Sequence, residues 1–179
     1  VSEWMGDTKV YRVNQSLVSA AQIEALKSKL QPGDVLLERR DWFLSNIGLP
    51  GFWPHAALYI GTAAERQAFF ADAEVQAWVK RQGETSGDFN ALLQVRAPQA
   101  YTNSLVPQEH NHVARVLEAM SEGVSFTTLE HSAACDALAV LRPKLAKVEK
   151  ARAILKAFQY AGRPYDFNFD FSTDAELVC

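Results

Sequence analysis

The 179-residue chain has few cysteines and no pattern that joins them into a framework. Cys135 and Cys179 form no C-x-x-C pair, so a zinc site built on thiolates is not expected. A single disulfide between them stays open, but two cysteines do not make a disulfide scaffold in a chain this long.

Basic charge and long apolar runs are scarce as well. Lysine and arginine number 18 against 21 acidic residues, a net charge of −3, so nucleic acid is not an expected partner. No apolar run approaches the roughly 20 residues that span a bilayer, so no transmembrane segment is expected. Residues 1–3 lack the basic start of a signal peptide. Because the chain starts with Val and stops on Cys, we interpret it as a piece of a longer protein or a processed chain.

The composition supports one packed core, with 48% hydrophobic residues, and we predict a single domain over residues 1–179. Apolar spacing predicts helices, and shorter apolar runs predict strands. The expected helices are 19–30, 63–80 and 144–161, and the expected strands are 34–38, 55–61, 114–119, 124–129 and 137–141, with a short edge strand at 92–95. Residues 41–51 are expected as a short helix or turn. The resulting class is α+β, with residues 63–113 inserted between two core strands.

Cys179 and His55 are the candidate nucleophile and base. Cys179 ends a loop-like segment that carries Gly162, Pro164 and Tyr165, and loops held by a scaffold often carry reactive groups. His55 follows Pro54 at the mouth of an apolar strand, which is a rigid mount for a general base. The plain alternatives are a buried inert cysteine and a structural histidine.

Glu118 is the candidate orienting group. A glutamate directly after Val116 and Leu117 is unusual, because charged groups are rarely buried unpaired. If strand 114–119 lies antiparallel to strand 55–61, its end brings Glu118 beside His55, where a carboxylate would fix the imidazole tautomer. The alternative is a Glu that points into water at a strand end.

The remaining candidates receive plainer interpretations. The spacing of His110 and His112 does not match the i, i+4 pattern of helical zinc sites, so we expect a polar loop, and the same holds for His131. We interpret Cys135 as a structural cysteine. The aromatic residues around His55 are either core or the wall of an apolar substrate groove; they are Trp42, Phe52 and Trp53.

Four segments, taken in order, resemble the circularly permuted branch of the NlpC-type, papain-like cysteine hydrolases, specifically the YiiX/YebB-like family. They are Pro32-Gly33-Asp34-Val35-Leu36-Leu37, Pro54-His55-Ala56-Ala57-Leu58-Tyr59-Ile60-Gly61, Val116-Leu117-Glu118-Ala119 with Gly123-Val124, and Gly162-Arg163-Pro164-Tyr165-Asp166-Phe167 leading to Cys179.

This resemblance implies a permuted papain-like fold, with Cys179 as nucleophile, His55 as base and Glu118 as orienting group. It also implies Tyr165 near the substrate, no metal or organic cofactor, and a bacterial cell-envelope or periplasmic location. The family's continuation beyond the cysteine is absent from this sequence, and the insertion is longer than a minimal member needs.

Three functions therefore stand as expectations. The first is a cysteine hydrolase that cleaves an amide through an acyl-enzyme, with a peptide or a peptidoglycan stem peptide (muropeptide) as substrate. The second is an acyltransferase or lipid-directed hydrolase that uses the same three residues on an acyl-containing substrate. The third is a non-catalytic binding module, which an unreactive Cys179 would favour.

Overall fold

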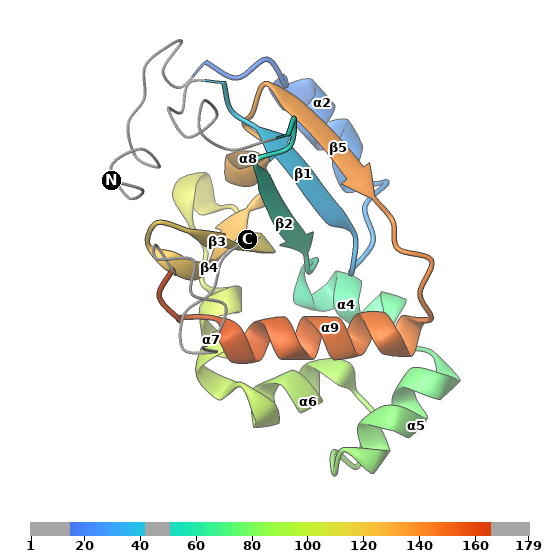
Figure 1. The fold of residues 1–179 in the computed structure, drawn as a ribbon. Helices are drawn as coiled ribbons and strands as arrows, with labels where there is room; N and C mark the ends of the chain where they lie inside the picture. The colour runs from blue at the N-terminus through green and yellow to red at the C-terminus, as the bar shows by residue number, and fades with distance from the viewer. Residues whose placement is uncertain (1–14, 42–50, 166–179) are drawn as a thin grey trace.

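The structure is a computed structural model that describes residues 15–41 and 51–165 (Figure 1). The helix or turn expected for residues 41–51 lies almost wholly outside this described part. No helix within it is both long enough and apolar enough to cross a membrane.

The centre of the described fold is an antiparallel sheet of five strands (Figure 1). The strands are β1 (Val35–Arg39), β2 (His55–Tyr59), β3 (Ala114–Met120), β4 (Gly123–Thr128) and β5 (Ala137–Leu141). Their order in the sheet is β4-β3-β2-β1-β5, so the apolar β2 is central. Each of the five expected strand segments is present, and the α+β class is confirmed.

One face of the sheet packs against two short helices, α2 (Ala20–Lys27) and α8 (Leu129–Ser132). Ser19 caps α2 through a capping box with Gln22, as its position in the sequence predicts. Alternate residues along the strands point to this face, and they form a buried cluster with residues of the helices. The cluster contains Ile23, Leu30, Leu36, Ala57, Tyr59, Val116, Leu129 and Ala133.

The opposite face carries a larger cluster that joins the sheet to the remaining helices. These helices are α4 (Ala63–Phe69), α5 (Ala73–Arg81), α6 (Phe89–Arg96), α7 (Pro98–Leu105) and α9 (Lys147–Tyr160). The long α9 runs across this layer in Figure 1, and Ile154 and Phe158 pack from it into the cluster. A short 3-10 turn, Glu109–Asn111, precedes β3.

Two expectations for the insertion are wrong in detail. The single helix expected over 63–80 is two helices, because the Asp72 side chain accepts hydrogen bonds from Glu74 N and Val75 N and starts a new helix. The edge strand expected at 92–95 is the middle of α6, which Asp88 caps in the same way. Residues 89, 92 and 93 are buried, and this is helical spacing rather than strand alternation.

Helix α6 offers a direct test of this correction. Leu93 is fully buried and Val95, two positions later, is 68% exposed. We expect Leu93→Ala to lower the free energy of unfolding by about 2–5 kcal/mol, because it leaves a cavity in the core. Val95→Ala should change it by less than about 0.5 kcal/mol. Urea denaturation measures both. Equal losses would contradict the placement of this helix, since an edge strand has no such division between the two positions.

Candidate active site

His55 and Glu118 are in direct contact on the face of the sheet that α2 and α8 cover. His55 Nε2 lies 2.7 Å from Glu118 Oε2. The contact arises because β2 and β3 pair antiparallel with Leu58 opposite Leu117, which brings the start of β2 beside the end of β3. The Glu118 side chain is fully buried, whereas the imidazole keeps 15% of its surface exposed.

Hydrogen bonds keep Glu118 ionised despite its burial. Burial alone would raise the pKa of this carboxyl, but the hydrogen bond and charge of His55, with a further hydrogen bond from Thr127, lower the pKa below its ordinary value. The Thr127 hydroxyl donates to Glu118 Oε1 at 2.6 Å. A carboxylate can only accept, so the shared proton sits on His55 Nε2. Nδ1 is then the ring nitrogen that can take up another proton.

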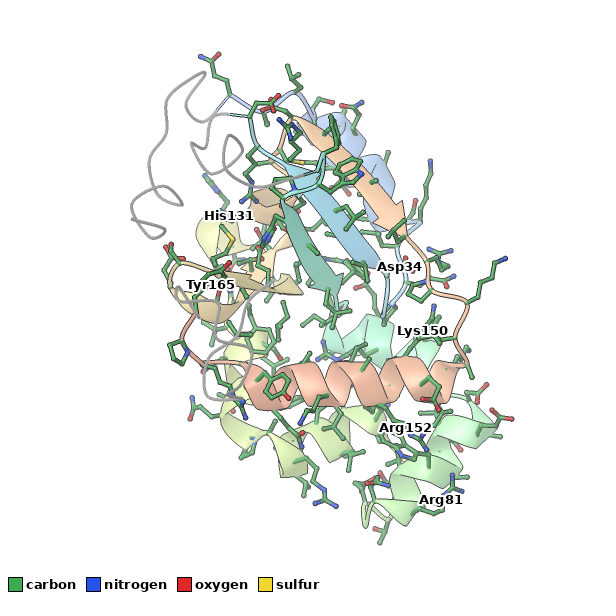
Figure 2. All side chains as sticks on the ribbon, viewed as in Figure 1. Asp34, Arg81, His131, Lys150, Arg152 and Tyr165 are labelled. Atoms are coloured by element: carbon green, nitrogen blue, oxygen red, sulfur yellow. The ribbon has the colours of Figure 1, made fainter. Side chains whose placement is uncertain are left out.

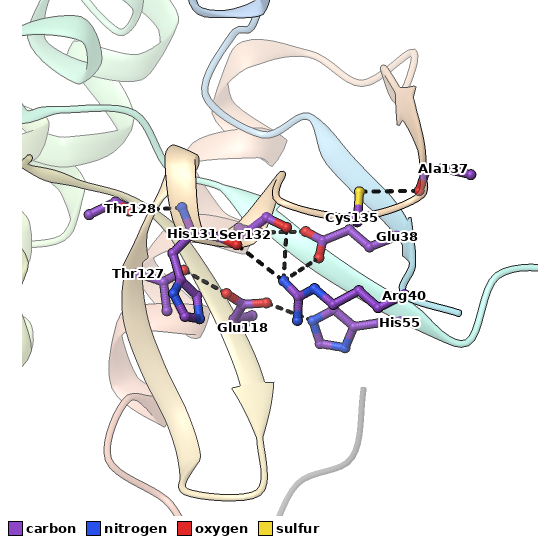
Figure 3. A network of polar contacts seen from close by, with 10 residues as sticks. All are labelled: Glu38, Arg40, His55, Glu118, Thr127, Thr128, His131, Ser132, Cys135 and Ala137. Carbon is purple, nitrogen blue, oxygen red and sulfur yellow. Dashed lines mark hydrogen bonds and ion pairs between the residues drawn. The ribbon is translucent and has the colours of Figure 1, made fainter. Parts of the chain in front are cut away.

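A second buried carboxyl, Glu38, lies on the neighbouring strand β1 directly opposite His55 (Figure 3). It is 1% exposed and accepts a hydrogen bond from Arg40 Nη2 at 3.0 Å and another from the Ser132 hydroxyl. Arg40 Nη2 also donates to the Ser132 carbonyl oxygen at 2.8 Å, which ties the end of β1 to α8.

The two carboxyl groups make this a site of concentrated charge. Burial, followed by the charge of Glu118, raises the pKa of Glu38 to about 7, while Arg40, His55 and Ser132 act in the opposite direction. Two titratable groups with pKa values pushed apart in this way are typical of functional sites.

The same three residues have the spacing of a possible cation site. One nitrogen or oxygen atom each of Glu38, His55 and Glu118 lies within 4.8 Å of the others. The oxygens are already engaged, however, by donors from Arg40 and from hydroxyl groups. A guanidinium beside one carboxylate supplies the positive charge that a metal would bring, so we interpret the cluster as a hydrogen-bonded network.

Residues 162–163, which precede the segment that leads to Cys179, are fixed to the β3–β4 hairpin. Val124 N donates to the Arg163 carbonyl oxygen at 2.9 Å, and Gly162 N donates to the Val124 carbonyl oxygen at 2.7 Å. Gly123, in the turn, has a φ of 103°, and a Cβ placed on it would collide with the Arg163 carbonyl oxygen. The hairpin whose first strand carries Glu118 therefore also holds the approach to the candidate nucleophile.

Of the remaining expected site residues, Tyr165 and Trp53 lie within the described part of the chain. Tyr165 is half-buried beside the hairpin (Figure 2), two residues past Arg163. Trp53 is 38% exposed two positions before His55, in edge-to-face contact with Phe52, so it is not a core residue. Cys179 and Trp42 lie outside the described residues.

The residues that we expected to be a structural cysteine and polar-loop histidines have ordinary surroundings. Cys135 is buried, and burial, with the charge of Glu38 adding to it, raises the pKa of its thiol to about 12. His110 is exposed and His112 is half-buried just before β3, and His112 Nδ1 lies 3.2 Å from Glu130 Oε1. His131 is exposed on α8, with its backbone N–H bound to the cap Thr128.

Sequence reasoning missed Glu38, Arg40 and Ser132. The signal for Glu38 was present, since it interrupts an apolar strand just as Glu118 does. Arg40 and Ser132 gave no local signal, because 92 positions separate them and only the fold brings them together.

Comparison with known protein families gives a match over most of the chain. A family model described as permuted papain-like amidase enzyme, YaeF/YiiX, C92 family, matches residues 29–179. The matched range contains His55, Glu118 and Cys179. No curated protein and no solved structure matches the chain.

The close approach at Gly123 provides a test of how residues 162–163 are held. We expect Gly123→Ala to lower the free energy of unfolding by roughly 3 kcal/mol, because it adds a clash to the cost of a positive φ. The matched control is Gly83→Ala, where φ is +94° but no atom lies within 4 Å, so only about 1 kcal/mol should be lost. Thermal and urea unfolding measure both. Equal losses in the two variants would show that residues 162–163 do not rest on this turn.

Proposed function

The chain belongs to the permuted papain-like amidases of the YaeF/YiiX, C92 family, a family of cysteine hydrolases, and from this premise we propose that it cleaves an amide through an acyl-enzyme on Cys179. The observation that carries the proposal is the 2.7 Å contact between His55 and the ionised, buried Glu118. A base held in one tautomer by a carboxylate is what a thiol nucleophile requires.

The proposed reaction uses the two ring nitrogens of His55 for different tasks. Nε2 keeps its proton and donates it in a hydrogen bond to Glu118, and Nδ1 takes the proton of the Cys179 thiol. The thiolate attacks the amide carbonyl carbon, and the backbone N–H of Cys179 helps to stabilise the resulting oxyanion. His55 then delivers its proton to the leaving amine. Water, deprotonated by the same nitrogen, releases the acid and restores the thiol.

Glu118 supports each of these steps without touching the substrate. Because it stays ionised, it stabilises the imidazolium that forms in both halves of the reaction. The hydrogen bond from Thr127 holds the second oxygen, so the carboxylate cannot rotate away from the ring.

The substrate class follows from the family. An amidase acts on a peptide-like substrate, and we propose that the amide lies in a peptidoglycan stem peptide. A second candidate is an acyl transfer or hydrolysis on a lipid-like substrate. It is favoured by the exposed aromatic pair Phe52 and Trp53, which places apolar surface two residues from the base.

The pH dependence of alkylation at Cys179 tests the catalytic pair. With iodoacetamide and peptide mass spectrometry, we expect Cys179 to label rapidly at mildly acid pH, because pairing with His55 favours the thiolate. His55→Ala should return Cys179 to an ordinary thiol curve near pH 8.5 and slow its labelling at pH 6 by roughly two orders of magnitude.

Two controls sharpen this measurement. Cys135 is the internal one, because burial holds its pKa near 12 and its labelling should be slow at every pH tested. In Glu118→Gln, the labelling rate of Cys179 at pH 6 should lie between those of the intact protein and of His55→Ala. The imidazole ring stays in this variant, but its orientation is lost. An ordinary thiol curve for Cys179 in the unsubstituted chain would sink the hydrolase proposal and favour a binding module.

A substrate panel separates the two candidate activities. We expect release of a free amine from muropeptides that carry a stem peptide, with no release by Cys179→Ala. Plain peptides of the same sequence test whether the sugar matters. Phospholipids and acyl thioesters test the second candidate, and turnover of these alone would replace the peptidoglycan proposal by the acyl-directed one.

A further inference from the structure

Glu38 has no part in the mechanism above, although it is buried next to the base. It stands on β1, and Glu118 stands on β3, so the central strand β2 presents His55 between them. The carboxyl group is 1% exposed. A carboxyl buried at this depth is costly unless donors and opposite charge compensate it, so its surroundings decide which form it takes.

The neighbouring donors and positive charge favour the ionised form of Glu38, and they act against the effect of its burial. Arg40 and the Ser132 hydroxyl both direct donors at the Glu38 oxygens. Arg40 is itself anchored by the Ser132 carbonyl, with only 11% of its side chain exposed, so the cation cannot easily leave. The guanidinium of Arg40 lies beside the Glu38 carboxyl in Figure 3.

The charged and titratable groups around Glu38 come from four of the segments that meet it, whereas β5 places the apolar Leu138 opposite it. The four groups are Arg40 at the end of β1, His55 on β2, Glu118 on β3, and Cys135 after α8. The negative charge of Glu118 disfavours a second negative charge on Glu38, whereas Arg40 and His55 favour it. Because the interaction between Glu38 and His55 is mutual, a negative charge on Glu38 must also favour the imidazolium form of His55.

We propose that Glu38 is a second positioning residue of the reaction, which acts on His55 from β1 while Glu118 acts from β3, and that Arg40 and Ser132 hold it in place. This inference rests on the proposed function for its meaning, because it concerns the base of that reaction. Its chemistry is electrostatic. The carboxylate stabilises the imidazolium that forms when Cys179 gives up its proton.

This role makes the strength of the base depend on pH in a defined direction. With a pKa raised to about 7 by burial and by Glu118, Glu38 loses its charge as the pH falls through neutrality. The imidazolium of His55 then loses one of its two anionic neighbours in the pH range where the reaction needs that negative charge. As the pH is lowered, activity should therefore begin to decline at a higher pH than it would if Glu118 were the single carboxylate partner of His55.

The titration of His55, followed by NMR through its ring Cε1–H signal, tests the proposal without any substrate. The measurement uses Cys179→Ala, so that the thiol of Cys179 does not contribute, and His55→Ala identifies the signal among four histidines. We expect Glu38→Gln to lower the His55 titration midpoint by about one pH unit, since an anion close to the ring is removed. Glu38→Asp keeps the charge and should stay near the original midpoint.

A matched control removes a carboxylate elsewhere in the same sheet region. Glu65 binds Arg115 and Tyr59 past the other end of β2, so Glu65→Gln should leave the His55 midpoint unchanged. If Glu38→Gln does not fold, Ser132→Ala removes one donor that keeps Glu38 ionised, and a smaller shift in the same direction is expected.

The outcomes separate this inference from the proposed function. An unchanged His55 midpoint in Glu38→Gln, together with rapid labelling of Cys179, would overturn the role of Glu38 and leave the amidase proposal intact. A shifted midpoint with an unreactive Cys179 would support the coupling of Glu38 to His55 and overturn the amidase proposal instead. A shift equal to that of Glu65→Gln would also overturn the inference, because it would show a general effect of charge.

Discussion

The site depends on the burial of two carboxyl groups on one face of a small sheet. Glu38 and Glu118 cannot both be ionised there without compensation, because water is excluded and like charges repel. The fold provides compensation from four directions, with a guanidinium, an imidazole and two hydroxyl groups. The register of β2 and β3 places His55 in this network, where its ring N–H donates to Glu118.

The insertion, residues 63–113, has a structural role, because it covers one face of the sheet. Its helices α4 to α7 pack with α9 on the sheet face opposite to His55 and Glu118, and residues of the insertion make up about half of the larger cluster. The site therefore rests on a sheet whose far side is rigidly filled. Close packing of this kind limits the movement of β2 and β3 against each other, and the 2.7 Å contact depends on their register.

The sequence alone predicted the five strands and, on the condition that residues 55–61 pair antiparallel with residues 114–119, the contact between His55 and Glu118. Five short apolar runs predicted five strands, and one antiparallel pairing was enough to bring Glu118 beside His55. The prediction failed at residues 92–95, where a four-residue apolar run is compatible with either a strand or a buried helix. The cap residue Asp88 and the buried positions 89, 92 and 93 would have favoured the helix.

The Glu38 network could not be predicted because its bonds join distant parts of the chain. The Ser132 hydroxyl is 94 positions from Glu38, and nothing near either residue indicates the other. Side-chain hydrogen bonds of this range are set by the packing of α8 on the sheet, and they follow only after the register of the strands is known.

The anchoring of residues 162–163 on the β3–β4 hairpin has a consequence for the order in which the protein is made. Synthesis on the ribosome proceeds from the N-terminus, and His55, Glu118 and the hairpin all precede Gly162 in the chain. A nascent chain can therefore carry the whole imidazole–carboxylate machinery before the thiol of Cys179 is translated. Of the three residues in the proposed reaction, Cys179 is translated after the other two, and also after residues 162–163, which bond to the hairpin. An incomplete chain released before that point contains His55 and Glu118 but not Cys179.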